Sequence, residues 1–259
     1  MKQLELNEDV IYRLIGESHG PLSHRIYQSP TYWKSRVQDV THSKFISAIK
    51  RNNIPYVKYA LLEHLIDPSI NNNEAIVFAA SNGDTEIIRF LLEGERVDPS
   101  ADDIKEAARN DRIEIVRLLL EDKRVDPSAN DNKAIRSAAS NGYTEIVRLL
   151  LVDERVDPSA NDNCAIRDAA YYGCTEVVKL LLEDKRVDPS AKNNYAIREA
   201  ASEGRTEVVR LLLGDERVDP SANNDYAIRE AALYGHTEVV RLLLTDERVN
   251  SRINGTDSI

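Results

Sequence analysis

Histidine and cysteine, which often carry out catalysis or bind metals, are few in this 259-residue chain, with five His and two Cys. The five histidines are scattered, and none lies in a zinc-binding His-Glu-x-x-His pattern. Neither a Gly-rich phosphate loop nor a nucleophile elbow is present. Clusters of Asn and Asp recur, but each holds at most one Asp, whereas calcium requires six to eight oxygens. We therefore predict no enzyme, no metal and no cofactor, and we expect turns at the clusters, which are residues 71–73, 130–132, 161–163, 193–194 and 223–225.

A ladder of basic residues is the next chemical feature, with Arg136, Arg167, Arg198 and Arg229 in equivalent places and Lys105 at the start. One interpretation is an anion-binding stripe. The other is that each arginine packs its stem, donates to turn carbonyls and is neutralised by an adjacent acid. We favour the second interpretation, in which the neutralising acids are Asp168, Glu199 and Glu230.

The Asx clusters and the basic ladder both follow a sequence repeat of 31 residues. Asp-Pro pairs begin at residues 67, 98, 126, 157, 188 and 219, so successive pairs lie 31, 28, 31, 31 and 31 residues apart. Self-similarity at this period is typical of stacked helix pairs. The sequence predicts an all-α solenoid of helix-turn-helix units with short connecting turns. Its parts are an N-terminal segment at 1–41, an array of about seven units at 42–250 and a flexible tail at 251–259.

One unit shows how the elements should form. A first helix over residues 134–141 has apolar residues at helical spacing and ends at Gly142, which suits a left-handed conformation. Thr144 is the expected N-cap of a second helix whose apolar stripe lies within residues 146–151. The Asx cluster at 161–163 should turn the chain with positive φ angles. The unit at Ile104 has lost three turn residues and has Asp111 in place of the glycine, so we expect the weakest joint there.

The pattern resembles the ankyrin repeat, whose unit is a turn followed by two antiparallel helices. Residues 133–136 stand at the family's Thr-Pro-Leu-His opening, and the Ala-Ala pair, Gly142 and residues 146–151 match the rest. Ala and Arg replace the Pro and His of that opening, and each unit is about two residues shorter. The Asp-Pro-Ser-Ala-Asn units are similar in style to arrays of large DNA viruses of amoebae. The resemblance implies a non-enzymatic protein–protein interaction module that binds a partner on the concave face of the array.

The family's recognition positions select, in this chain, the residue before each first helix and the two residues before each glycine. These positions vary between units while the framework hardly changes, as a contact surface should. Tyrosine, a typical hot-spot residue, gathers there in the last three units, although it could also fill crevices between helices. We predict a partner-binding surface between Cys164 and His236, made by Tyr171, Tyr172, Tyr195, Glu203, Tyr226, Leu233 and Tyr234.

Charge and hydropathy limit the classes of partner that we expect the chain to bind. The net charge of −10 disfavours nucleic acid and favours a protein with a basic or neutral surface. No run approaches 18 apolar residues and no signal peptide is recognisable, so we expect no membrane partner. We also expect free thiols and a cytoplasmic or nuclear location, in a host cell if the protein is viral. The last unit should expose an apolar end face suited to self-association, formed by Val239, Val240, Leu243 and Leu244.

The N-terminal segment has two interpretations. Residues 6–15, with Trp33 a further 27 residues after Leu6, resemble an F-box, and the match would imply binding to a Skp1-type adaptor of a ubiquitin ligase. Asn7 stands where that family has Pro, and serines occupy expected apolar positions. The alternative, which we favour, is a helical cap over the first repeat. The adaptor-binding candidates are Val10, Ile11, Leu14 and Trp33.

Overall fold

Every regular element among the residues that the structure describes is an α-helix. The structure is a computed structural model, and it describes residues 40–63, 65–94 and 97–249. The described chain divides into two compact units, one containing residues up to Ala79 with Glu86–Val97, the other containing Ala80–Thr85 and residues from Asp98 onward. No helix in the described part is long and apolar enough to cross a membrane.

The first unit contains α4 (His42–Lys50), α5 (Ile54–Leu62), most of α6 (Ile70–Asn82) and most of α7 (Thr85–Glu93). Thr41 caps α4 by accepting a hydrogen bond from the Lys44 amide, and Asn53 caps α5 in the same way. Phe45 and Ile49 are fully buried between these helices. Two lysines lie over aromatic rings, with Lys50 Nζ 3.9 Å from the Phe78 centroid and Lys58 Nζ 4.2 Å from the Phe90 centroid.

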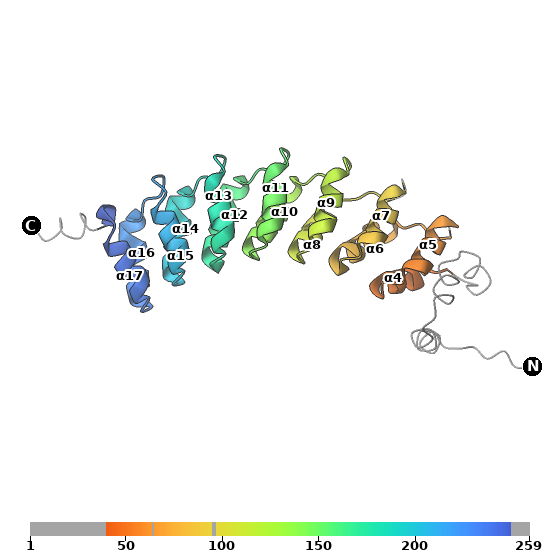
Figure 1. Cartoon of the computed structure of the whole chain (residues 1–259), viewed down its shortest axis with the longest axis horizontal. Coiled ribbons are helices and arrows are strands. Elements are labelled where there is room, and N and C mark those ends of the chain that lie inside the picture. Colours follow the sequence, from red (N-terminus) through yellow and green to blue (C-terminus); the bar gives the residue numbers. More distant parts are fainter. Residues whose placement is uncertain (1–39, 64, 95–96, 250–259) are drawn as a thin grey trace, which may run out of the picture. The chain divides into compact units, whose positions relative to one another are not determined.

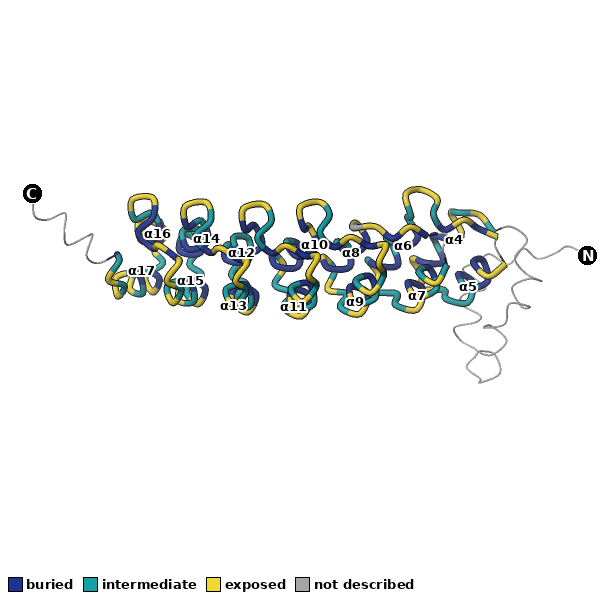
Figure 2. The backbone as a smooth tube through the Cα atoms, turned by 90° about the horizontal axis from the view of Figure 1, so that it is seen from above, coloured by how far each residue is buried: buried dark blue, intermediate teal, exposed yellow. Residues whose placement is uncertain are grey.

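The second unit is a stack of helix pairs arranged in two rows. Consecutive first helices pack on each other, and so do consecutive second helices (Figures 1 and 2). The small Ala-Ala pair of α8, α10, α12 and α14 and the first alanine of the pair in α16 are buried at this contact, which allows the close approach. The Ile, Val and Leu stripe of each second helix completes the core. The predicted all-α solenoid of helix pairs is confirmed. The first helices are α8 (Ala101–Arg109), α10 (Ala129–Ser140), α12 (Ala160–Tyr172), α14 (Ala191–Ser202) and α16 (Ala222–Leu233); the second helices are α9 (Ile113–Glu121), α11 (Thr144–Val152), α13 (Thr175–Glu183), α15 (Thr206–Leu213) and α17 (Thr237–Leu244).

The expected turn chemistry is present at the start of α10, α12, α14 and α16. Three successive residues, such as Asn161, Asp162 and Asn163, have φ between 54° and 58°, so the regular part of α12 begins after them. Gly142 is left-handed with φ 74°, as predicted. The prediction of Thr144 as an N-cap is wrong by one residue. Tyr143 is the cap because its carbonyl accepts the first helical hydrogen bond, from Val147, while the Thr144 hydroxyl donates back to the Gly142 carbonyl.

The shortened unit replaces the missing turn with a capping box. Ser100 caps α8 through its hydroxyl, and the Asp103 carboxylate accepts hydrogen bonds from the Ser100 amide and hydroxyl. Asp111 takes the left-handed position of the absent glycine, with φ 56°. Asp has a short polar side chain that tolerates this conformation, so the helix pair keeps its geometry despite the deletion.

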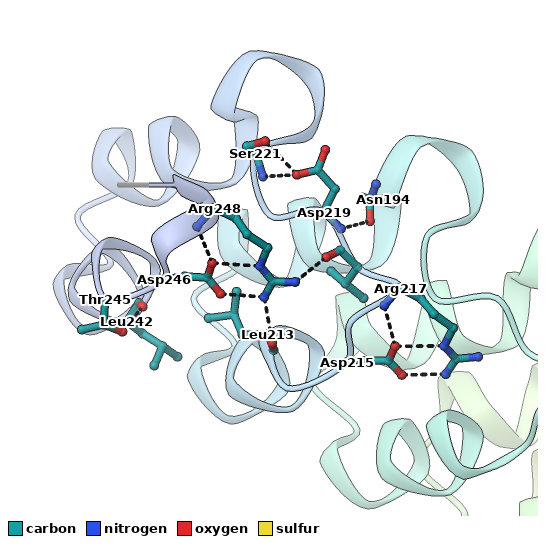
Figure 3. A network of polar contacts seen from close by, with 11 residues as sticks. Asn194, Leu213, Asp215, Arg217, Asp219, Ser221, Leu242, Thr245, Asp246 and Arg248 are labelled. Carbon is teal, nitrogen blue, oxygen red and sulfur yellow. Dashed lines mark hydrogen bonds and ion pairs between the residues drawn. The ribbon is translucent and has the colours of Figure 1, made fainter. Parts of the chain in front are cut away.

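Arginines after each second helix join neighbouring repeats. Arg248 pairs with Asp246 at 2.6 Å and reaches back to donate to the carbonyls of Val218 and Leu213 at 2.8 Å each (Figure 3). Buried asparagines provide a second link, since Asn194 Oδ1 accepts the amide of Asp219 at 2.7 Å. These links hold each repeat to the one before it; the equivalent arginines are Arg155, Arg186 and Arg217, and the equivalent asparagines are Asn132 and Asn163.

Candidate functional site

The predicted contact residues lie on three successive first helices. Tyr171 and Tyr172 end α12, Tyr195 lies in α14, and Tyr226 and Leu233 lie in α16. The structure leaves three of the predicted side chains strongly exposed, with exposed fractions of 57% for Tyr172, 71% for Leu233 and 61% for Tyr234. The other four are half-buried. We call the seven residues Tyr171, Tyr172, Tyr195, Glu203, Tyr226, Leu233 and Tyr234 the tyrosine surface.

The half-buried tyrosines interleave with the arginine ladder. The Arg167 guanidinium lies 5.1 Å from the Tyr195 ring centroid, and the Arg198 guanidinium lies 5.7 Å from Tyr195 and 5.0 Å from Tyr226. Such cation–π contacts hold both rings in fixed positions. Tyr195 and Tyr226 therefore do pack between repeats, as the alternative interpretation held, but each keeps a partly exposed ring.

Each ladder arginine donates one hydrogen bond to a turn, whereas the buried Nε atoms of Arg136, Arg167 and Arg198 have no hydrogen-bond partner among the described residues. Arg136, Arg167 and Arg229 each donate to a carbonyl of the left-handed turn at 3.2 Å, and Arg198 does so at 3.4 Å. The interpretation that these arginines bind turn carbonyls is confirmed. The structure does not show the expected neutralisation, because among the described residues Asp168, Glu199 and Glu230 form no ion pair with the ladder. Lys105 differs and pairs with Asp102 at 2.7 Å.

Carboxylates that form no ion pair among the described residues therefore occupy the middle of these helices, although Arg198 lies close enough to act on Glu199. Burial raises the pKa of Glu199; the Arg198 charge opposes this shift, and the charges of Glu203 and Glu230 add to it. Glu203 is 3.8 Å from Arg205, at the edge of ion-pair distance. The surface thus combines tyrosine rings with half-buried negative charge, a combination that attracts cations.

Both ends of the predicted stretch belong to the framework. Cys164 is 8% exposed and its thiol lies 3.0 Å from an Asp168 oxygen, so it offers a partner little surface. His236 Nε2 is 2.9 Å from the Ser202 carbonyl of the preceding repeat. Sequence reasoning missed this second function of the residue before each second helix. Its signal was the residue directly after the left-handed Gly or Asp111, and Arg112, Cys174 and Arg205 reach back to carbonyls in the same way.

The remaining predicted sites have three different outcomes. Cys164 and Cys174 are both free thiols. Within the described part of the chain, no three His, Cys, Asp or Glu residues are grouped so that they could hold a metal ion. The adaptor-binding candidates Val10, Ile11, Leu14 and Trp33 lie outside the described residues, as does the 251–259 tail.

The end face of the last repeat is less apolar than expected. Val239 and Leu243 are 1% and 0% exposed because they face inward onto the stack. Leu244 is 42% exposed and Val240 is half-buried, whereas Val209, which occupies the equivalent place to Val240, is fully buried. The expectation of four uncovered side chains is therefore wrong for two of them.

Comparison with known protein families gives a match over the second part of the chain. A family model described as ankyrin repeats (three copies) matches residues 104–193 and 166–257, which together cover more than half of the chain. The comparison of this chain with curated proteins found no match.

Proposed function

Because the chain belongs to the ankyrin-repeat family, whose members are generally protein–protein interaction modules, we propose that it binds a partner protein through the tyrosine surface. The observation that carries this proposal is the outward exposure of Tyr172, Leu233 and Tyr234 on first helices whose framework is otherwise constant. Large aromatic side chains contribute strongly to binding when a partner covers them. We place this surface on the concave face of the array, and we propose binding without catalysis.

The partner's chemistry follows from charge. The chain carries a net charge of −10, and the half-buried carboxylates beside the tyrosine surface form no ion pair among the described residues. We propose a protein partner with a basic or neutral surface and not a nucleic acid or a membrane, encountered in the cytoplasm or nucleus. A virus-encoded chain would meet it in the host cell.

Affinity purification with mass spectrometry tests the proposal. Tyr172→Ala, Leu233→Ala and Tyr234→Ala combined in one chain should lose partners that the unchanged chain retains from eukaryotic lysate. Val152→Ala is the matched control, because Val152 is 79% exposed and apolar but lies at the end of the second helix α11. If the triple variant and the control retain the same partners, the tyrosine surface is not the binding site.

A substrate receptor of an SCF-type ubiquitin ligase is the alternative function, and it depends on the N-terminal segment. Alanine at Val10, Ile11 and Trp33 distinguishes the two interpretations of that segment. Loss of adaptor binding with the circular dichroism and melting temperature unchanged would identify an F-box, while loss of folding would identify a cap. A truncation to residues 43–259 analysed beside the full chain gives the same comparison by partner list.

We further propose weak self-association through the C-terminal end face. Leu244 and Val240 form a small apolar area there that no described segment covers fully. Leu244→Glu should abolish any concentration-dependent dimer in analytical ultracentrifugation. A chain that stays monomeric at about 100 µM, well above the weak-binding range, would exclude this contact.

A further inference from the structure

Three carboxylates on the helices that carry the tyrosine surface recur once per repeat at matching positions. Asp168 in α12, Glu199 in α14 and Glu230 in α16 are 31 residues apart in sequence. Their helices pack consecutively and the three acids occupy equivalent positions on them, so the acids lie in a row along the stack. Packed helices are about 8–10 Å apart, which sets the spacing of the row.

Rigid tyrosines line this row. Burial raises the pKa values of Tyr195 and Tyr226; the charges of Asp168 and Glu199 add to the shift of Tyr195, and those of Glu199 and Glu230 add to the shift of Tyr226, so each tyrosine lies near two carboxylates. Arg167 and Arg198 hold these rings in place. At the carboxyl ends of the same helices, Tyr172 and Leu233 are exposed. A ligand lying along the row would therefore contact aromatic or aliphatic side chains on both sides.

The spacing of the row matches an extended polypeptide. A β-like chain advances about 3.3 Å per residue, so three residues span about 10 Å. A polyproline II helix has three residues per turn and a rise of about 3.1 Å, so it presents the same side every 9 Å or so. Only the polyproline II conformation places every third side chain opposite successive repeats, because side chains i and i+3 of a β-strand point to opposite faces. An α-helix would instead need about six residues to cover that distance at 1.5 Å each.

We propose that the tyrosine surface receives an extended segment of a partner protein that carries Lys or Arg at every third residue. The basic side chains meet Asp168, Glu199 and Glu230 in turn, while the intervening residues contact the tyrosines. This inference rests on the proposed function and specifies the partner's chemistry.

Two peptides of identical composition test the register. Fluorescein-labelled Ser-Lys-Pro-Ser-Lys-Pro-Ser-Lys-Pro carries lysine at every third position, and Ser-Pro-Ser-Lys-Lys-Lys-Pro-Ser-Pro carries the lysines together. Fluorescence anisotropy with the full chain at low salt should show the spaced peptide binding about fivefold more tightly, because the clustered peptide cannot reach all three carboxylates. Glu199→Gln and Glu230→Gln should each weaken the spaced peptide about threefold. Glu207→Gln, on the outer side of α15, is the matched control and should change nothing.

The outcomes separate this inference from the proposed function. Equal affinity for the two peptides, or no binding of either, overturns the inference. The function still stands in that case if the triple variant Tyr172→Ala, Leu233→Ala and Tyr234→Ala loses protein partners that the unchanged chain retains. A spaced peptide that binds equally well to Glu199→Gln and Glu230→Gln also overturns it, because the peptide is then bound elsewhere.

Discussion

Asp103 is a buried acid whose ionisation works against folding. Its side chain is fully buried, and its Oδ1 atom has no hydrogen-bond partner among the described residues. Burial raises the pKa of Asp103 to about 6 from 3.8, and the charges of Asp102 and Asp98 add to the shift, although hydrogen bonds from Ser100 oppose it. Because the folded state holds this proton more tightly than the unfolded state, the contribution to stability is complete below about pH 4. It is lost as the pH rises through 6.

Asp103→Asn should therefore change the pH dependence of stability. The amide keeps an acceptor for Ser100 but carries no charge. From pH 4 to pH 7, the unfolding free energy of the variant should rise by about 1–3 kcal/mol relative to the unchanged chain, since one pKa unit corresponds to about 1.4 kcal/mol. Urea unfolding at the two pH values measures this difference. A difference that does not vary with pH would show that Asp103 titrates normally.

Substitutions at two glycines distinguish the cost of backbone strain from the cost of disturbing a contact between repeats. Gly204 and Gly235 are both left-handed, with φ of 67° and 75°. A Cβ atom at Gly204 would lie 2.6 Å from Nδ1 of His236, whereas a Cβ atom at Gly235 would meet nothing within 4 Å. Gly235→Ala should cost about 1 kcal/mol from the left-handed backbone alone. Gly204→Ala should cost about 2–3 kcal/mol, because His236 must also move from its carbonyl partner. Equal costs in urea unfolding would mean that His236 shifts freely.

At the scale of the helix pair, the arginine links hold repeats together. Arg186 donates to the carbonyls of Val156 at 2.8 Å and Leu151 at 3.0 Å while pairing with Asp184 at 2.6 Å. Lysine cannot make this planar set of contacts. Arg186→Lys should lower the unfolding free energy by about 2 kcal/mol. Arg148→Lys, in an exposed pair 3.7 Å from Glu145, should cost under about 0.5 kcal/mol.

The pair of Arg186 with Asp184 also determines how the stability of this helix pair changes at low pH. Hydrogen bonds from Arg186 hold the pKa of Asp184 below its usual 3.8, although burial opposes them. The contribution of this carboxylate is therefore present above about pH 4 and lost as the pH falls further, which is the opposite sign to Asp103. The cost of Arg186→Lys should accordingly shrink near pH 2 in the same unfolding measurement. An unchanged cost there would assign the link to the carbonyl contacts alone.

The helix pairs and their turns could be predicted from the sequence because they depend on local periodicity. Gly142 and the Asx cluster at 161–163 are residue types that favour a left-handed backbone conformation, and the structure has positive φ angles at each of them. The arginine links could not be predicted, since Arg155 reaches carbonyls 30 and 35 residues away and a backbone carbonyl leaves no sequence signal. The burial of Cys164 depends equally on its neighbours, which a single unit does not reveal.

At the scale of the whole stack in the second unit, each repeat contacts its neighbours. Deleting a segment as long as one repeat should therefore leave a stack that still folds. Deleting residues 188–218 removes 31 residues and joins Val187 to Asp219, which recreates a native Val-Asp junction. Arg248 would then find the carbonyls of Val187 and Leu182, which Arg217 uses in the full chain. We expect a folded protein with a sharp thermal transition, less stable by about 2–4 kcal/mol at typical stabilities per residue.

A shorter deletion is the informative control for this prediction. Removing residues 203–218 takes out α15 alone and leaves the apolar face of α14 without its partner helix. Although about half as many residues are lost, this variant should lose more stability than the full-repeat deletion, because the stack is interrupted and not merely shortened. Circular dichroism melts of the two variants decide the matter. If the half-repeat deletion proved the more stable, stability would depend on the number of residues retained and not on the contacts between neighbouring repeats.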